Sequence, residues 1–270
     1  MNLTAIADGQ KYIATECFDR TLDYRCPVCN APMILKRGTR KHPHFAHEAH
    51  SACEVSGETL EHLKAKAFMY KGLKNNPAVE YVDVECTRFE GIRPDIAFKP
   101  YGMNRWIGIE LQRSGISELE ILQRSRRYEE AGVYLLWVAT EKMYKKILAV
   151  VSDEFPEISL SAQARMFITL HDALVVFTGD DLMAFRFENA TREREGYNYY
   201  DGPTGEFWTE TLKTRFVPVS YKHITAGDLM TAPRFFRVNG KFMSIHSLIQ
   251  IKRRLYDDFE YFEEFEGGAA

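Results

Sequence analysis

The middle of the chain, residues 55–150, alternates between apolar residues at helical spacing and short apolar runs. Helical spacing predicts one helix over Glu58–Gly72 and a second that begins after Ser117, whose hydroxyl can cap it, and runs to Ala131. A third helix is predicted from Glu141 to about Val151. The runs that predict strands are Val79–Cys86, Arg93–Phe98, Trp106–Gln112 and Val133–Val138. The order α-β-β-β-α-β-α indicates an α/β fold for this zone.

The flanking zones have weaker patterns. Residues 1–54 are rich in Cys, His, Pro and turn residues, with strand candidates at Ile6–Thr15 and Met33–Arg37. Residues 151–270 predict a mixed α+β region. Its predicted elements are the strands Ala173–Phe177 and Leu182–Phe187, joined at Gly179–Asp181, and a helix from Ser244 to about Tyr261. We therefore predict three units, 1–54, 55–150 and 151–270. For the third unit we consider contact with a protein partner or a second copy of the chain.

Composition limits the classes of function. The 270 residues are 45% hydrophobic, enough for a sizeable core, and the net charge of −3 excludes a protein that coats DNA by its overall charge. Contact with nucleic acid would need a local basic patch. The first residues lack the basic and apolar segments of a signal peptide, and no apolar run is long enough to span a bilayer. We expect a cytoplasmic protein with no membrane partner.

The cysteines and histidines of the first zone have metal-ligand spacing. Five cysteines, an odd number, include the pair Cys26 and Cys29, and the pattern C-x₂-C-x₁₄-H-x₂-H ends at His44 and His47. Thiolates and imidazoles together favour tetrahedral Zn²⁺, so we predict a structural zinc on these four residues. His50 and Cys53 remain alternatives to the two histidines. The module is either a scaffold or a surface that places basic residues on DNA: Arg25, Lys36, Arg37, Arg40 and Lys41.

Two carboxylates fall on the strands of the middle zone. Side chains alternate between the faces of a strand, so Glu110 and Gln112 share a face opposite the apolar one, and Asp95 shares a face with Arg93. On neighbouring strands, Asp95 and Glu110 would meet at one site. Such a pair suits a hard cation such as Mg²⁺, which can activate a water for attack on a phosphate. The alternative is two ordinary carboxylates at strand ends.

The segments RPDIAF (Arg93–Phe98) and IGIELQRS (Ile107–Ser114) resemble the D…ExQ motif of the competence protein CoiA-like nuclease family. The resemblance covers roughly Tyr24–Val150. It includes HFAH at His44–His47, and these further residues: Glu61, His62, Ser117, Glu118, Arg124, Arg127, Tyr128 and Trp137. It implies a PD-(D/E)xK restriction-endonuclease-like core, αβββαβ, preceded by a zinc-finger-like module.

By this resemblance Asp95 and Glu110 are ligands of Mg²⁺ or Mn²⁺, and Gln112 occupies the place of the superfamily's lysine. Glutamine brings no charge, and Arg93 is the nearest predicted source of one. Glu61 and His62, on one side of the first helix, complete the predicted catalytic set. Two arginines of the second helix are candidates for holding phosphates, although a solvated helix face explains them nearly as well: Arg124 and Arg127.

The sequence therefore predicts a metal-dependent DNA endonuclease or nickase, acting in competence, mobile-element or phage-related DNA processing. The main alternative is a catalytically inactive module that binds nucleic acid or a partner on the same fold. A third interpretation is a zinc-stabilised adaptor whose last zone recruits another protein. The choice between DNA and RNA is left open by the sequence.

Overall fold

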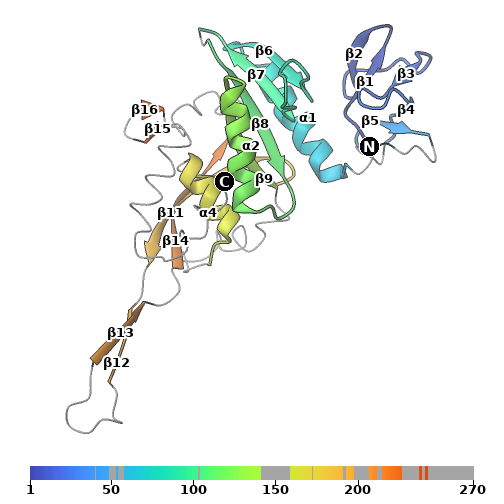
Figure 1. The fold of residues 1–270 in the computed structure, drawn as a ribbon. Helices are drawn as coiled ribbons and strands as arrows, with labels where there is room; N and C mark the ends of the chain where they lie inside the picture. Colours follow the sequence, from blue (N-terminus) through green and yellow to red (C-terminus); the bar gives the residue numbers. More distant parts are fainter. Residues whose placement is uncertain are drawn as a thin grey trace, which may run out of the picture.

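The computed structural model describes residues 1–226, except for 40, 49–52, 54–57, 103, 141–158, 172, 191–192, 198–206 and 212–214, together with residues 237–238 and 241–242. The helices predicted at Glu141–Val151 and Ser244–Tyr261 lie outside the described residues. The strands form a five-stranded and a seven-stranded sheet (Figure 1). Two further pairs are β12 (Glu193–Tyr197) with β13 (Phe207–Thr211), and β15 (Arg237–Val238) with β16 (Lys241–Phe242).

The five-stranded sheet is antiparallel and has the order β2-β1-β3-β4-β5. Its strands are β1 (Thr4–Ala7), β2 (Gln10–Ile13), β3 (Tyr24–Arg25), β4 (Pro32–Lys36) and β5 (His44–His47). The backbone of Asn2 exchanges hydrogen bonds of 2.9 and 2.8 Å with Phe45, so β5 returns to the segment before β1. The small sheet is therefore closed around a core that includes Leu3, Tyr24 and Phe45.

The single strand predicted over Ile6–Thr15 is wrong, because the segment is a hairpin of β1 and β2. Ala7 pairs with Gln10, which leaves a loop of Asp8 and Gly9 with φ values of 49° and 73°. Two consecutive residues at positive φ are what a type I′ turn requires, and Asp-Gly is a preferred sequence for it. The strand predicted over Met33–Arg37 corresponds to β4.

The seven-stranded sheet has the order β14-β11-β10-β9-β8-β7-β6. The elements α1 (Leu60–Lys74), β6 (Val79–Val84), β7 (Ile96–Pro100), β8 (Trp106–Gln112), α2 (Glu118–Glu130) and β9 (Val133–Thr140) follow one another along the chain. They are followed by α4 (Ala162–His171), β10 (Leu174–Phe177), β11 (Leu182–Ala190) and β14 (Arg215–Ile224). Strand β9 is parallel to β8 and β10, and the other neighbours are antiparallel. The predicted order of the first six elements is observed.

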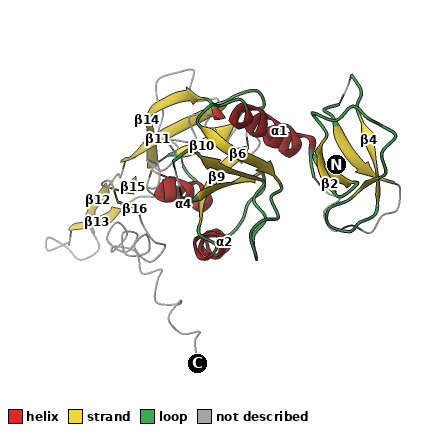
Figure 2. Ribbon diagram, turned by 90° about the horizontal axis from the view of Figure 1, so that it is seen from above, coloured by secondary structure: helices red, strands yellow, loops and turns green. Residues whose placement is uncertain are grey.

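Helices cover both faces of this sheet. Helix α1 packs on one face against a cluster that contains Ile107, Ile109 and Leu136, whereas α2 and α4 pack on the other face with Leu135 and Trp137 (Figure 2). The division follows from strand alternation, since neighbouring residues of a strand enter opposite layers. The result is a mixed α/β unit with a helical layer on each side.

The remaining differences between the predicted and the observed elements are the ends of strands and one helix that was not predicted. Helix α4 had not been predicted, and Asp95 lies just before β7 rather than within it. Ser117 caps α2 as predicted, since its hydroxyl accepts a hydrogen bond from the backbone N–H of Glu120 at 3.1 Å. Among the described residues, no helix combines the length and apolar character needed to cross a membrane.

Candidate functional site

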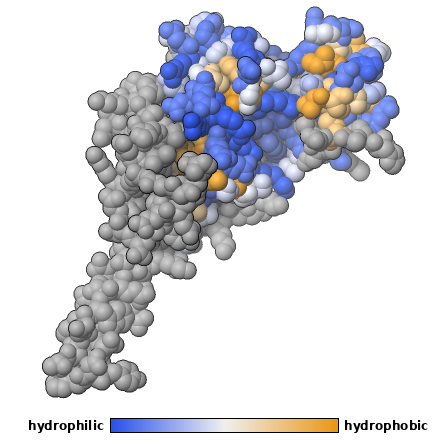
Figure 3. Space-filling view, viewed as in Figure 1, coloured by the Kyte–Doolittle hydropathy of each residue, from blue (hydrophilic) through white to orange (hydrophobic). Residues whose placement is uncertain are grey.

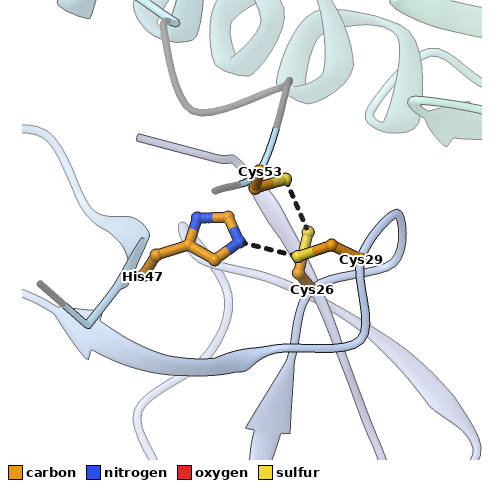
Figure 4. A group of neighbouring side chains, drawn as sticks. All are labelled: Cys26, Cys29, His47 and Cys53. Carbon is orange, nitrogen blue, oxygen red and sulfur yellow. Dashed lines mark hydrogen bonds between the residues drawn. The ribbon is translucent and has the colours of Figure 1, made fainter. Parts of the chain in front are cut away.

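Four potential metal ligands meet in the N-terminal unit: Cys26, Cys29, His47 and Cys53 (Figure 4). Their ligand atoms all lie within 4.8 Å of one another. Sγ of Cys26 is 3.9 Å from Sγ of Cys53, and Sγ of Cys29 is 3.3 Å from Nε2 of His47. These residues come from the turn between β3 and β4, from β5 and from the segment after β5, so the cluster ties three parts of the unit together.

The cluster fits a tetrahedral zinc ion. With Zn–S bonds of about 2.3 Å, two sulfur ligands lie roughly 3.8 Å apart, close to the separation of Cys26 and Cys53. The backbone N–H of Val28 donates to Sγ of Cys26 at 3.4 Å, which fixes the position of this sulfur on the turn. The pKa of Cys29 is lowered mainly by a hydrogen bond from the backbone of Ala31. Three thiolates and one imidazole are a common structural zinc set.

The prediction of His44 as a zinc ligand is wrong, and Cys53 stands in its place. His44 and His47 are three residues apart on β5, and positions three apart on a strand point to opposite faces. Ring atom Nδ1 of His44 instead lies 2.9 Å from the carbonyl oxygen of His42. The other three predicted ligands, Cys26, Cys29 and His47, belong to the cluster, whereas the alternative His50 lies outside the described residues.

Of the two carboxylates of the middle zone, Glu110 lies on β8 and Asp95 lies just before the neighbouring strand β7. Ile96 of β7 pairs with Ile109 of β8, so one further step along each strand places Asp95 opposite Glu110. Residues directly opposite each other in an antiparallel pair have adjacent side chains. Each carboxylate is held by a different helix: Asp95 contacts α1, and Glu110 contacts α2. The pair therefore occupies the point where the sheet meets both helical layers.

Asp95 is held as a carboxylate. Its Oδ2 atom accepts a hydrogen bond of 2.9 Å from the backbone N–H of Leu111 and lies 3.1 Å from Nε2 of His62. Burial alone would raise the pKa of Asp95, but the charges of His62 and Lys66 and the Leu111 bond keep it below its ordinary value. Burial would likewise lower the pKa of His62, and Asp95 raises it instead. The two form an ion pair.

The pKa of Glu110 is shifted in the opposite direction from that of Asp95. Burial, followed by the charge of Asp95, raises the pKa of Glu110 to about 7, although the Tyr128 hydroxyl and Arg124 oppose this shift. Tyr128 donates a hydrogen bond to Oε1 of Glu110, and Nη1 of Arg124 lies 3.6 Å from Oε2. The partly buried carboxylates of Asp95 and Glu110 therefore repel each other, and a bound cation would relieve this repulsion.

The other predicted site residues make contacts of their own. The side-chain amide of Gln112 donates to the carbonyl of Ser114 at 2.7 Å, and Glu61 pairs with Arg113 at 3.0 Å. Arg93 donates to Glu85 at 2.8 Å instead of facing the carboxylate pair, and Arg124 also binds Glu120 at 2.7 Å. Arg127 is exposed on α2. The structure brings together Asp95, Glu110, His62 and Arg124, and leaves Glu61, Arg93 and Arg127 at the periphery.

Lys66 of α1 was not among the predicted site residues. Its side chain is 3% exposed, and its ammonium group lies 2.5 Å from Glu58 and is hydrogen-bonded to Glu85. Burial would lower the pKa of Lys66, but Glu85, Glu58 and Asp95 raise it above its ordinary value. The signal was the spacing of Glu58, His62 and Lys66, which are four residues apart and share a helix face. The buried cation therefore stands beside the carboxylate pair.

Two family matches cover most of the described chain. Residues 9–56 match the family described as competence protein CoiA, N-terminal domain, and residues 58–178 match competence protein CoiA, nuclease-like domain. Competence protein CoiA of Bacillus subtilis (strain 168) is 27% identical over 115 residues, which are 42% of this chain and 30% of that protein. The match thus spans under a third of that relative's length. No solved structure matches the chain.

Proposed function

The chain belongs to the competence protein CoiA-like family, and on this premise we propose that it is a metal-dependent nuclease that hydrolyses phosphodiester bonds of DNA. The observation that carries the proposal is the partly buried pair of Asp95, just before β7, and Glu110 of β8, which the register of the two strands places opposite each other. Two oxygen donors at one point suit a hard divalent cation, and the match to a nuclease-like domain supplies the substrate class.

The topology supports a PD-(D/E)xK core in residues 55–150. The order α1-β6-β7-β8-α2-β9, with β8 parallel to β9, agrees with the αβββαβ core that the sequence motifs imply. Residues 1–54 then form the zinc-binding module, and 151–270 form a C-terminal region of separate role. In this proposal the protein works in the cytoplasm on DNA linked to competence, and the C-terminal region is where a protein partner or second copy binds.

Asp95 and Glu110 would hold Mg²⁺ or Mn²⁺, which, when bound, activates water and stabilises charge on the phosphate. His62 keeps Asp95 ionised and in place. Tyr128 and Arg124 fix the orientation of Glu110 from α2. These contacts pre-organise both carboxylates, so little reorganisation is needed when the cation arrives.

Gln112 occupies the place of the superfamily's lysine but carries no charge, and Lys66 of α1 supplies a positive charge instead. The charge of Lys66 acts on Asp95, as its effect on the pKa of that carboxyl indicates. We assign Lys66 to positioning, because its ammonium group is held by Glu58 and Glu85. Gln112, two residues after Glu110 on β8, remains a hydrogen-bonding group. Its side-chain amide donates a hydrogen bond to the carbonyl of Ser114 and fixes the chain after β8. Arg124 and Arg127 are the proposed phosphate contacts on α2.

The test is incubation of the purified protein with supercoiled, linear and single-stranded DNA, with and without Mg²⁺ or Mn²⁺. Wild type should cleave only with the cation. Glu110→Ala should abolish cleavage, whereas Glu90→Ala, which removes an exposed carboxylate, should leave it unchanged. Gln112→Ala removes only a hydrogen-bonding group and should reduce the rate by roughly ten- to a hundredfold. Equal cleavage by Glu110→Ala and wild type, or cleavage in excess EDTA, would replace this proposal with the inactive binding module.

A further inference from the structure

A groove of about 790 Å³ lies on the N-terminal unit, beside β4 and β5 and the segments that flank them. Four permanently charged cations line it: Arg20, Lys36, Arg37 and Lys41. His44 also lines the groove, and its lining contains no Asp or Glu. A concentration of positive charge of this kind is unexpected in a chain of net charge −3.

These cations differ from others in the same unit. Lys11 and Arg25 form ion pairs with Asp83 and Asp23. In the part of the chain that the structure describes, no carboxylate lies within ion-pair distance of Lys36 or Lys41, and both are exposed. Their charge is available for an external anion.

Hydrogen bonds within the unit hold the lining of the groove in place before a ligand binds. Arg37 donates to the carbonyl oxygens of Ala14, Thr15 and Cys17 at 2.9, 3.3 and 3.2 Å. Arg20 in turn donates to the carbonyl of Arg37 at 2.7 Å. These contacts fix the strand end that carries Lys36, so the cationic lining does not have to be ordered when a ligand binds.

The groove combines its charges with apolar surface. Ile34, 42% exposed on the outer face of β4, lies opposite Ala46 of β5, and both line the groove together with Leu22. Figure 3 shows apolar surface beside hydrophilic surface on the N-terminal unit, whereas the visible face around α2 is mainly hydrophilic. A duplex would offer phosphates to the cations and leave the apolar floor unused, but an unpaired strand also offers bases to it.

The N-terminal unit contacts the unit that carries the candidate active site: Lys11 of β2 pairs with Asp83 of β6 at 3.0 Å, and the Thr4 hydroxyl donates to Glu85 at 2.5 Å. His42, between Lys41 and His44, has its pKa lowered by burial and then by the charge of Lys64 of α1. Lys64 is exposed and only two residues from His62. Glu85 also pairs with Lys66 of α1, the helix whose His62 contacts Asp95.

We propose that this groove binds the backbone of a single-stranded nucleic acid and holds that strand next to the nuclease site. The proposal rests on the nuclease function proposed above and names the strand form of its substrate. The cysteine cluster then has a mechanical role. It ties Cys26, His47 and Cys53 together behind the strands whose outer face forms the groove.

The test separates binding from cleavage. In the full-length Glu110→Ala background, without added Mg²⁺ or chelator, binding of fluorescent oligo(dT) is measured by anisotropy at several salt concentrations. Lys36→Gln with Lys41→Gln should weaken binding on the order of tenfold, and the slope of log K against log salt should fall by about 1.4, since two phosphate contacts are lost. The matched control, Lys71→Gln with Lys99→Gln, should change neither. Bound zinc and circular dichroism verify folding of each variant.

A second variant, Thr39→Glu, places a carboxylate in the lining without removing a lysine and should also weaken binding. Three results would overturn the proposal: equal losses in the groove and control variants, an unchanged salt slope, or tighter binding of duplex than of oligo(dT). The proposal would also be overturned if the groove variants lost binding to vesicles of anionic lipid but bound oligo(dT) as tightly as the unchanged groove does. Because cleavage is absent throughout, failure of the nuclease proposal would leave these results interpretable.

Discussion

The ring of Tyr128 in α2 packs directly on the backbone of Gly108 in β8. A Cβ atom at position 108 would lie 2.7 Å from Cε1 of Tyr128, closer than carbon atoms tolerate. This approach brings the Tyr128 hydroxyl to Glu110, which is on the same face of β8 two residues later. The absence of a side chain at Gly108 therefore determines how the carboxylate pair is supported.

We predict that Gly108→Ala weakens cation binding by moving Tyr128 away from Glu110. Tyr128→Phe should have a similar effect, because it removes the hydroxyl that favours the ionised carboxylate. Loss of one hydrogen bond to a charged group corresponds to about 1.5–3 kcal/mol, or roughly ten- to a hundredfold in affinity. Titration calorimetry with Mg²⁺ measures it. The control is Gly115→Ala, where an added Cβ meets no atom within 4 Å; an equal loss there would contradict the prediction.

The second prediction concerns zinc. The purified protein should contain about one equivalent per chain, and His47→Ala or Cys53→Ser should lose it, since each removes one of four ligands. His44→Ala and Cys17→Ser are the matched controls, because neither residue belongs to the cluster. Elemental analysis after gel filtration gives the answer. Loss of zinc in His44→Ala with retention in Cys53→Ser would restore the ligand set expected from the sequence.

The zinc ligands illustrate what the sequence could predict. Spacing was enough for Cys26 and Cys29, because a C-x₂-C pair lies on one tight turn. For His44 and His47 the choice depended on secondary structure: three residues apart is one face of a helix but two faces of a strand. Cys53 itself lies outside any helix or strand, so no periodic pattern could place it at the cluster.

The middle zone was more predictable because its elements are long and periodic. The order of helices and strands followed from apolar patterning, whereas the meeting of Asp95 and Glu110 was expected only on the condition that their strands are neighbours. Lys66 was different, since a lysine on a helix usually faces solvent. Lys66 is buried because it pairs with carboxylates, above all Glu85, which follows β6 and is far from Lys66 in the sequence. A single sequence does not reveal such a long-range contact.

The third prediction follows from that burial. Lys66→Met should lower the free energy of unfolding by about 3–5 kcal/mol, because Glu58 and Glu85 would remain buried without their cation. Urea denaturation followed by tryptophan fluorescence measures the change. Lys64→Met, on the exposed side of α1, is the control and should shift stability by under about 0.5 kcal/mol. Similar effects of the two substitutions would show that the Lys66 contacts contribute little.

The fourth prediction concerns acid stability. Burial lowers the pKa of His171 to about 3, and its Nε2 accepts a hydrogen bond of 3.0 Å from the backbone N–H of Trp137. The unfolded chain protonates this histidine near pH 6.5, whereas the folded protein does so only near pH 3. Neutral His171 thus contributes stability above pH 6.5 that is lost as the pH falls toward 3, by about 1.4 kcal/mol per pH unit.

Urea midpoints at pH 7, 6, 5 and 4 check this dependence. His171→Gln keeps an acceptor but has no titratable ring, so its stability should fall less steeply between pH 6.5 and 5, where most carboxylates remain ionised. Parallel curves for the variant and wild type would show that another group causes the acid dependence.

The last prediction is the pH dependence of cation binding. The pKa of Glu110 is raised to about 7, so below that pH the metal-free protein carries a proton on Glu110 that a cation must displace. Asp95, whose pKa is lowered, is already ionised in this range. Affinity for Mg²⁺ should therefore rise about tenfold per pH unit up to pH 7 and then level off, with one proton released per cation below pH 7. Calorimetry in two buffers of different ionisation enthalpy counts that proton.

The same shift has an effect on the metal-free protein. A carboxyl group whose folded pKa is raised contributes stability below its unfolded pKa of about 4.5, and this is lost as the pH rises through 7. Glu110→Gln removes the buried charge, so the metal-free variant should be more stable than wild type at pH 8, by up to about 3 kcal/mol. Mg²⁺ should raise the unfolding midpoint of wild type and leave that of Glu110→Gln unchanged. If Mg²⁺ stabilises both proteins equally, the cation binds elsewhere and Glu110 is not its ligand.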